Sequence, residues 1–164
     1  MTSSNEYVII GIDPGLMTGT FVYQSRDGYT DADHLEVPEL ITTCHQFLGW
    51  WAATGDVDNV HIAIERYIIT PKTAKLSQQT EALEVTGMVK AIAAIHGVTD
   101  VRQYAKSNLK FASDDMMRGV GWHSPSFRHA NDAARQAFAL LKDVDYPRWS
   151  ELVRDAKIEP TTEG

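Results

Sequence analysis

Two stretches of the chain consist almost entirely of apolar residues, and each ends in a single acidic residue. The first stretch, 8–12, ends at Asp13, and the second, 60–64, ends at Glu65. An apolar run of this length is typical of a strand that is buried on both faces of a sheet. Pro14 cannot donate a hydrogen bond to a neighbouring strand, so the first strand should end at or near Asp13.

Shorter apolar segments and turn residues predict three further strands, at 18–23, 34–37 and 98–104. The first two are separated by Arg26-Asp27-Gly28, and an Asp-Gly pair is a strong signal for the turn of a hairpin. The chain therefore begins with three strands that can pair in a meander.

Apolar residues that recur at three- and four-residue spacing predict the helices. The expected helices run from Pro38 to Gly55, from Thr70-Pro71 to Gly97, from about Ser107 to Arg118, and from Arg128 to Leu141. Three strands followed by alternating helices and strands predict an α/β fold, with a mixed five-stranded sheet and helices on both faces. We expect a single domain over 1–155 and a flexible tail over 156–164.

Composition and charge narrow the class of protein. The chain has 164 residues, of which 43% are hydrophobic and 23% charged, which suits a globular domain with a sizeable core. A net charge of −7 argues mildly against nonspecific binding to nucleic acid, although acidic metal ligands are compatible with a nuclease. The chain has no apolar run long enough to cross a membrane and no signal-peptide pattern, and its single cysteine, Cys44, fits a reducing cytoplasm.

Four side chains are candidates for metal binding or catalysis. Asp13 and Glu65 emerge at the same edge of the sheet if their strands are neighbours, and His129 and Asp132 lie on one face of the last helix because they are three residues apart. Four such ligands from three elements suit two Mg²⁺ or Mn²⁺ ions about 3.5–4 Å apart, the arrangement used for hydrolysis of phosphodiesters.

Each of these residues also has a purely structural explanation. Asp13 can cap the turn that follows it, and Glu65 can form an ion pair with Arg66. His129 and Asp132 can be solvated residues in the first turn of a helix. The joint pattern favours the functional interpretation, because two acids end buried strands and a further pair shares a helix face.

Three motifs resemble the active-site motifs of the RuvC-type Holliday junction resolvases, which have a ribonuclease H-like fold. They are Gly11-Ile12-Asp13-Pro14-Gly15, Ala63-Ile64-Glu65-Arg66 and His129-Ala130-Asn131-Asp132-Ala133-Ala134. The resemblance covers roughly 7–141, and it implies that Asp13, Glu65, His129 and Asp132 bind metal or take part in catalysis. His129 stands where the family often has aspartate, which leaves open whether it binds metal or moves protons.

The resemblance further implies a homodimer that makes paired nicks in four-way DNA junctions and leaves 5′-phosphate and 3′-hydroxyl ends. The single cysteine predicts a cytoplasmic protein, and the short length and divergence of the chain are compatible with a phage member of the family that acts in the cytoplasm of its host. Candidate DNA contacts are the aromatic ring and the basic groups of Tyr67, Lys72, Lys75, Lys106, Lys110 and Arg118. Lys106 and Lys110 form the best pair, because a helix would place them on one face.

Three alternatives stay open at this point. A nuclease of the same fold can act on RNA, flaps or replication forks, and the acidic segment 111–115 leaves room for such a substrate. A catalytically inactive module can bind branched DNA. A nucleotide-binding domain of the actin type is the weakest alternative, because Gly19-Thr20 resembles one phosphate loop but the second Asp-Gly-Gly loop is absent.

Overall fold

The computed structural model describes residues 6–54, 56–72 and 78–156. Its five strands are β1 (Val8–Asp13), β2 (Met17–Gln24), β3 (Thr30–Glu36), β4 (Val60–Arg66) and β5 (Asp100–Ala105). They form one sheet in the order β3-β2-β1-β4-β5, in which β1, β2 and β3 are antiparallel and β1, β4 and β5 are parallel. The sequence-based expectation of a mixed five-stranded sheet is confirmed.

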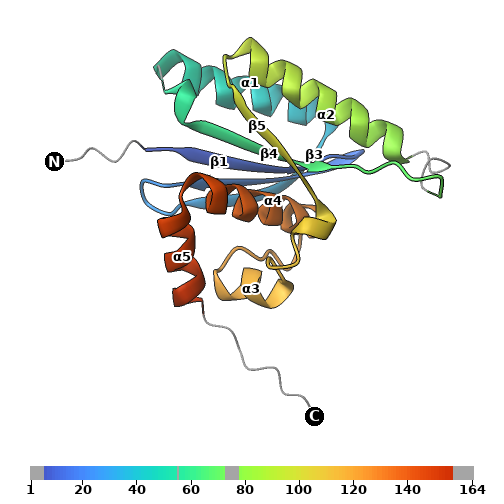
Figure 1. The fold of residues 1–164 in the computed structure, drawn as a ribbon. Helices are drawn as coiled ribbons and strands as arrows, with labels where there is room; N and C mark the ends of the chain where they lie inside the picture. The colour runs from blue at the N-terminus through green and yellow to red at the C-terminus, as the bar shows by residue number, and fades with distance from the viewer. Residues whose placement is uncertain (1–5, 55, 73–77, 157–164) are drawn as a thin grey trace.

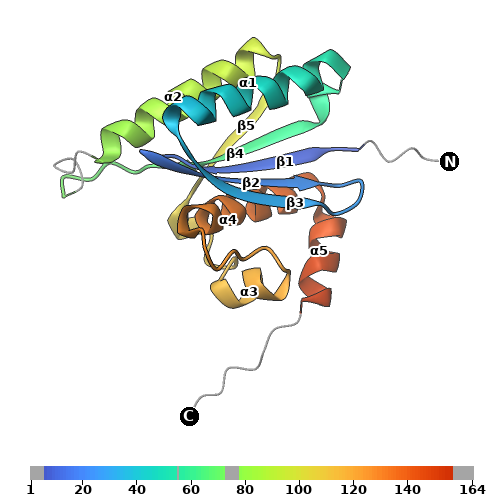
Figure 2. The same ribbon diagram turned by 180° about the vertical axis from the view of Figure 1, so that it is seen from behind.

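Helices cover both faces of this sheet (Figure 1). α1 (Val37–Thr54) and α2 (Gln78–Ile95) lie on one face, and α4 (Arg128–Val144) lies on the other. α3 (Asp114–Gly119) and α5 (Tyr146–Asp155) lie on the same side as α4, as the view from behind also shows (Figure 2). No helix in the described segments is long and apolar enough to cross a membrane.

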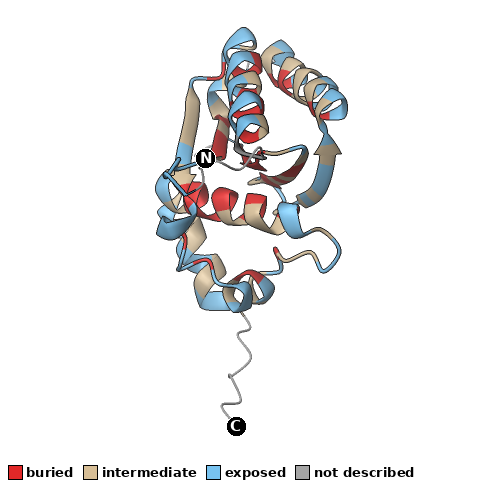
Figure 3. Ribbon diagram, turned by 90° about the vertical axis from the view of Figure 1, so that its right-hand side faces the viewer, coloured by how far each residue is buried: buried red, intermediate tan, exposed pale blue. Residues whose placement is uncertain are grey.

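The alternation of side chains along β1 divides the core between the two faces. Ile10 and Ile12 pack with α1 and α2, whereas Ile9 packs with α4. Side chains alternate between the faces of a sheet, so Gly11 and Asp13 share the α4 side with Ile9. Buried residues accordingly line the sheet and the inner sides of the helices (Figure 3).

Two glycines allow α4 to lie unusually close to the sheet. A Cβ at Gly11 would overlap the backbone carbonyl oxygen of Ala133, and a Cβ at Gly19 would overlap that of His129. Gly19 therefore packs under α4, which argues against the alternative in which Gly19-Thr20 forms a phosphate-binding loop. The first turn of α4 is held directly over the end of β1.

The structure corrects three expectations about the helices. The helix expected from about Ser107 to Arg118 is instead a 3₁₀ turn, Lys106–Asn108, followed by α3. α3 starts late because the hydroxyl of Ser113 accepts a hydrogen bond from the amide of Met116 and caps its first turn. Residues 70–72 are not helical, so the second long helix does not begin at Thr70-Pro71; its described part is Gln78–Ile95, and 73–77 lie outside the described residues.

The third correction concerns the C-terminal segment after Tyr146, whose polar sequence gave no helix prediction. It forms α5, which Asp145 caps by accepting a hydrogen bond from the amide of Arg148. Trp149 and Leu152 pack on the core beneath α4. Of the expected tail, 157–164 lie outside the described residues.

Candidate active site

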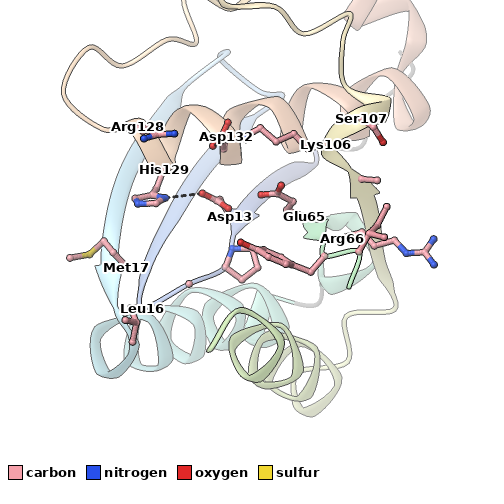
Figure 4. A pocket seen from close by; sticks show the side chains of 15 residues that line it. Asp13, Leu16, Met17, Glu65, Arg66, Lys106, Ser107, Arg128, His129 and Asp132 are labelled. Carbon is pink, nitrogen blue, oxygen red and sulfur yellow. Dashed lines mark hydrogen bonds and ion pairs between the residues drawn. The ribbon is translucent and has the colours of Figure 1, made fainter. Parts of the chain in front are cut away.

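Asp13 and Glu65 come from neighbouring parallel strands that end at the same edge of the sheet. Ile12 of β1 pairs with Ile64 of β4, so the two acids are the next residues along both strands. Ala63 packs on the α4 side, and alternation places Glu65 on that side with Asp13. The two carboxyl groups face each other (Figure 4), and each changes the pKa of the other.

α4 contributes the other two candidates from its first turn. The Nδ1 atom of His129 lies 3.0 Å from Oδ2 of Asp13. Asp132 lies one turn further along the same face, and its side chain is 16% exposed. Its Oδ2 accepts a hydrogen bond from Nζ of Lys106 at 3.2 Å, and its Oδ1 accepts one from Arg135 at 2.7 Å.

These side chains line one open cavity of about 610 Å³. Asp13, Glu65, His129, Asp132 and Lys106 all contribute to its wall (Figure 4). The rest of the lining is Pro14, Gly15, Leu16, Met17, Arg66, Tyr67, Ile68, Ala105, Ser107 and Arg128. The structure thus brings the four sequence-predicted residues together in one open cavity.

Burial and mutual repulsion change the acidity of the central pair. Burial, the hydrogen bond to Asp13 and the charge of Asp13 raise the pKa of Glu65 from 4.5 to about 8. Burial also raises the pKa of Asp13, and the negative charge of Asp132 adds to this effect. Both carboxyl groups are therefore harder to ionise than solvated carboxyl groups, and a divalent cation between them would favour their charged forms.

The structural explanations of the four residues do not fit their surroundings. The turn after β1 is held by Thr18, whose hydroxyl donates to the carbonyl of Gly15 at 3.1 Å, rather than by Asp13. Arg66 is exposed and points away from Glu65 (Figure 4). His129 and Asp132 are bound to partners across the cavity instead of being merely solvated.

The donor set fits a hard divalent cation at the central pair. Mg²⁺ and Mn²⁺ prefer carboxylate oxygens, and Mg²⁺ is commonly held by one or two carboxylates together with substrate phosphates. Asp13 and Glu65 supply such a pair. Among the described residues, no group of three histidine, cysteine, aspartate or glutamate side chains is arranged to hold a metal ion.

Two of the candidate DNA contacts line the cavity, and the other described ones do not. Lys106 and Tyr67 line it, and the Tyr67 side chain is partly exposed. Lys110 is exposed beyond the 3₁₀ turn, so it does not share a helix face with Lys106 as expected. Arg118 is exposed on α3 and forms an ion pair with Asp115. Lys72 is exposed, and Lys75 lies outside the described residues.

The sequence alone did not reveal the partners of Asp132. The pair with Arg135 spans three residues of one helix, a spacing that could have signalled it. The pair with Lys106 joins the end of β5 to α4, and no local pattern marks it. The structure also adds an apolar rim to the cavity, formed by Leu16, Met17 and Ile68.

Comparisons with known proteins define the fold. No protein-family model matches the chain, and no curated protein matches it. A structure of Thermus thermophilus RuvC in complex with a Holliday junction substrate is similar at a TM-score of 0.54 and 17% identity, over 85% of this chain and 96% of that chain. Another structure of Thermus thermophilus RuvC is similar at a TM-score of 0.53 and 16% identity, over 84% of this chain and 96% of that chain. The fold is the ribonuclease H-like fold of these structures.

Proposed function

We propose that this protein is a metal-dependent, structure-selective DNA endonuclease of the RuvC type, which resolves four-way junctions by paired nicks. The observation that carries this proposal is the pair of facing carboxyl groups of Asp13 and Glu65, with His129 and Asp132 beside them in one open cavity. The similar fold of a RuvC bound to a Holliday junction supports branched DNA as the substrate.

Asp13 and Glu65 are the residues that would hold Mg²⁺ or Mn²⁺, with Asp132 and His129 as the remaining candidates. A bound divalent ion supplies an activated water and offsets negative charge that develops on the phosphate. In the hydrolysis, the water oxygen forms a bond to phosphorus and the bond from phosphorus to the 3′ oxygen breaks. The products are a 5′-phosphate and a 3′-hydroxyl, and the leaving 3′ oxygen takes its proton from solvent.

In this proposal, His129 accepts the proton of the attacking water. An Nδ1–H that donates to Asp13 leaves Nε2 as a free acceptor, and half of the side chain is exposed. Asp13 fixes the ring in this orientation, as carboxylates do for catalytic imidazoles. His129 therefore acts in proton transfer in our proposal.

Basic and aromatic groups around the cavity would hold the DNA. Lys106 and Arg128 bring positive charge to the cavity wall, where the phosphate backbone would lie. Tyr67 presents a ring on which an unpaired base can stack. Because a junction is resolved by two nicks, we propose that the active form is a homodimer with one site in each protomer, acting on DNA in the cytoplasm.

The decisive experiment is cleavage of a synthetic four-way junction by the purified protein with Mg²⁺, Mn²⁺ or EDTA. We expect metal-dependent paired nicks with ligatable 5′-phosphates, and their loss in Asp13→Asn. Asp58→Asn is the matched control, because Asp58 is an exposed acid in a 3₁₀ turn away from the cavity.

Three outcomes would redirect the proposal. Preferred cleavage of RNA, flaps or forks in the same assay would assign the site to another nuclease class. Tight junction binding without cleavage would indicate a binding module. Failure to cut any branched DNA by the wild-type protein would overturn the proposed function.

A further inference from the structure

Two histidines meet between the two helices that cover the face of the sheet opposite α4. His45 lies in α1, and His96 is the first residue after α2. The Nδ1 atom of His45 is 3.0 Å from the Nε2 atom of His96, and the planes of the two rings are 72° apart. α1 and α2 lie side by side in both views (Figure 1 and Figure 2), so this contact joins the two helices directly.

The backbone at the end of α2 fixes the position of His96. The amide of His96 donates a hydrogen bond to the carbonyl of Ile92 at 3.2 Å. The amide of Val98 donates to the carbonyl of Ala93 at 2.9 Å, across Gly97. Gly97 has a φ of 82°, the left-handed conformation that commonly closes a helix and that favours glycine. His96 is therefore held at a capped helix end that faces α1.

Gly49 makes room for the His96 ring on the surface of α1. It lies one turn after His45, so the two positions share a face of the helix. A Cβ at Gly49 would lie 3.4 Å from Cε1 of His96, so a larger side chain would displace the ring. Glycine is unfavourable inside a helix, and here its missing side chain leaves the space beside the imidazole.

Two convergent imidazoles are a donor set for a transition-metal ion. Neutral imidazole suits Zn²⁺, Ni²⁺ and Cu²⁺, whereas Mg²⁺ prefers oxygen ligands. A tetrahedral Zn²⁺ ion with bonds of about 2.0–2.1 Å holds two nitrogens roughly 3.4 Å apart, so the pair needs to open by only a few tenths of an ångström. Both side chains are only partly buried, so the rings can turn toward one ion.

We propose that His45 and His96 form a binding site for one Zn²⁺ ion, or a similar transition-metal ion, that links α1 to α2. In the metal-free protein, one of the two facing nitrogens donates its proton to the other. With the ion bound, each ring carries its proton on its other nitrogen. No third histidine, cysteine, aspartate or glutamate completes the cluster among the described residues, so water supplies the remaining ligands.

This site is separate from the candidate active site. Asp13 lies on the α4 side of the sheet, whereas α1 and α2 lie on the opposite face (Figure 1). The inference therefore goes beyond the proposed nuclease function and does not rest on it.

The test is a calorimetric titration of the full-length protein with Zn²⁺, compared with His45→Gln and His96→Gln. Glutamine keeps a polar group at each position and removes the imidazole nitrogen. We expect each variant to bind one Zn²⁺ ion fewer than the wild-type protein, or to bind that ion at least about 100-fold more weakly. His34→Gln is the matched control, because the His34 ring packs on Phe127 instead, and it should bind as many ions as the wild-type protein.

Nuclear magnetic resonance tests the same site without a substitution. Zn²⁺ should shift the ring-proton signals of both His45 and His96, and Mg²⁺ should shift neither. Unshifted signals, or equal Zn²⁺ binding by the wild-type protein and both variants, would overturn the proposal. Loss of Zn²⁺ in His129→Ala alone would overturn it too, because the ion would then lie in the active-site cavity. Neither measurement involves DNA, so the proposed nuclease function can fail while this site stands, and the reverse.

Discussion

The α carbon of Gly11 in β1 lies directly beneath the backbone carbonyl of Ala133 in α4, with no room for a side chain between them. This contact sets the height of α4 above the sheet. His129, one turn before Ala133, thereby reaches Oδ2 of Asp13 at 3.0 Å. The glycine of the Gly-Ile-Asp motif is therefore required for packing, and the chemistry of the site depends on it indirectly.

We predict that Gly11→Ala destabilises the fold, because the added methyl group must push α4 away from β1. The free energy of unfolding should fall by at least about 2 kcal/mol, as measured by urea denaturation. Junction cleavage should fall as well, since the shift separates His129 from Asp13.

A matched variant on α2 separates this clash from a general effect of alanine. Gly87 is exposed and has no atom within 4 Å of the position of a Cβ. Gly87→Ala should stabilise the protein by up to about 1 kcal/mol, because alanine favours a helix over glycine. Equal stability of the two variants would contradict the proposed contact.

The acid pair makes the stability of the metal-free protein depend on pH. The pKa of Glu65 is 4.5 ordinarily and about 8 in the folded protein, so the folded chain holds the proton more tightly. The contribution of this group to stability is fully present below pH 4.5 and is lost as the pH rises to about 8. Thermal melts in EDTA should therefore show a Tm that declines across this range.

Glu65→Gln should flatten that decline, because the amide does not titrate. Above pH 8 the metal-free variant should melt at a higher temperature than the wild-type protein. Glu84→Gln, at an exposed position of α2, should retain the wild-type decline. Mg²⁺ should raise the Tm of the wild-type protein most at high pH, where both carboxylates are free to bind it.

His129 is expected to move protons rather than to bind metal. His129→Ala should slow junction cleavage by about 100- to 10,000-fold, the usual contribution of general acid–base catalysis. Added imidazole should restore part of the rate, because the cavity left by the side chain opens to solvent. Rescue by excess Mn²⁺ and not by imidazole would instead identify His129 as a ligand.

Tyr67 is expected to bind DNA through its ring. Tyr67→Ala should weaken junction binding about tenfold, within the range reported for stacking of one base on an aromatic side chain. Tyr67→Phe keeps the ring and should bind almost as the wild-type protein does. Tyr29→Ala, at an exposed tyrosine beside the β2–β3 turn, is the control and should leave the Kd of the junction unchanged in gel-shift titrations.

The buried strands and the acids at their ends could be predicted from the sequence. Apolar runs are local, and Pro14 marks the end of β1 whatever the rest of the chain does. The three-residue spacing of His129 and Asp132 likewise placed both on one helix face before any packing was known. The order of the elements was enough to predict the mixed sheet.

Other local signals were ambiguous or too weak. The segment from Ser107 to Arg118 has the periodicity of a helix, yet Ser113 caps a separate short helix within it. The sequence did not predict α5, because the segment is mostly polar. Its few apolar residues pack only against the core beneath α4.

The tertiary structure decided which charged groups meet in the site. His129 and Asp13 are 116 residues apart, and Lys106 and Asp132 are 26 residues apart. No spacing rule along the sequence predicts either contact. Both contacts depend on how closely α4 packs on the sheet and on the edge at which β5 ends. Periodicity indicates which face a residue occupies, whereas the backbone packing of distant elements determines which faces come within hydrogen-bonding distance. For that reason, the sequence could propose four candidate side chains, and only the fold showed that Asp132 also contacts Lys106 and Arg135.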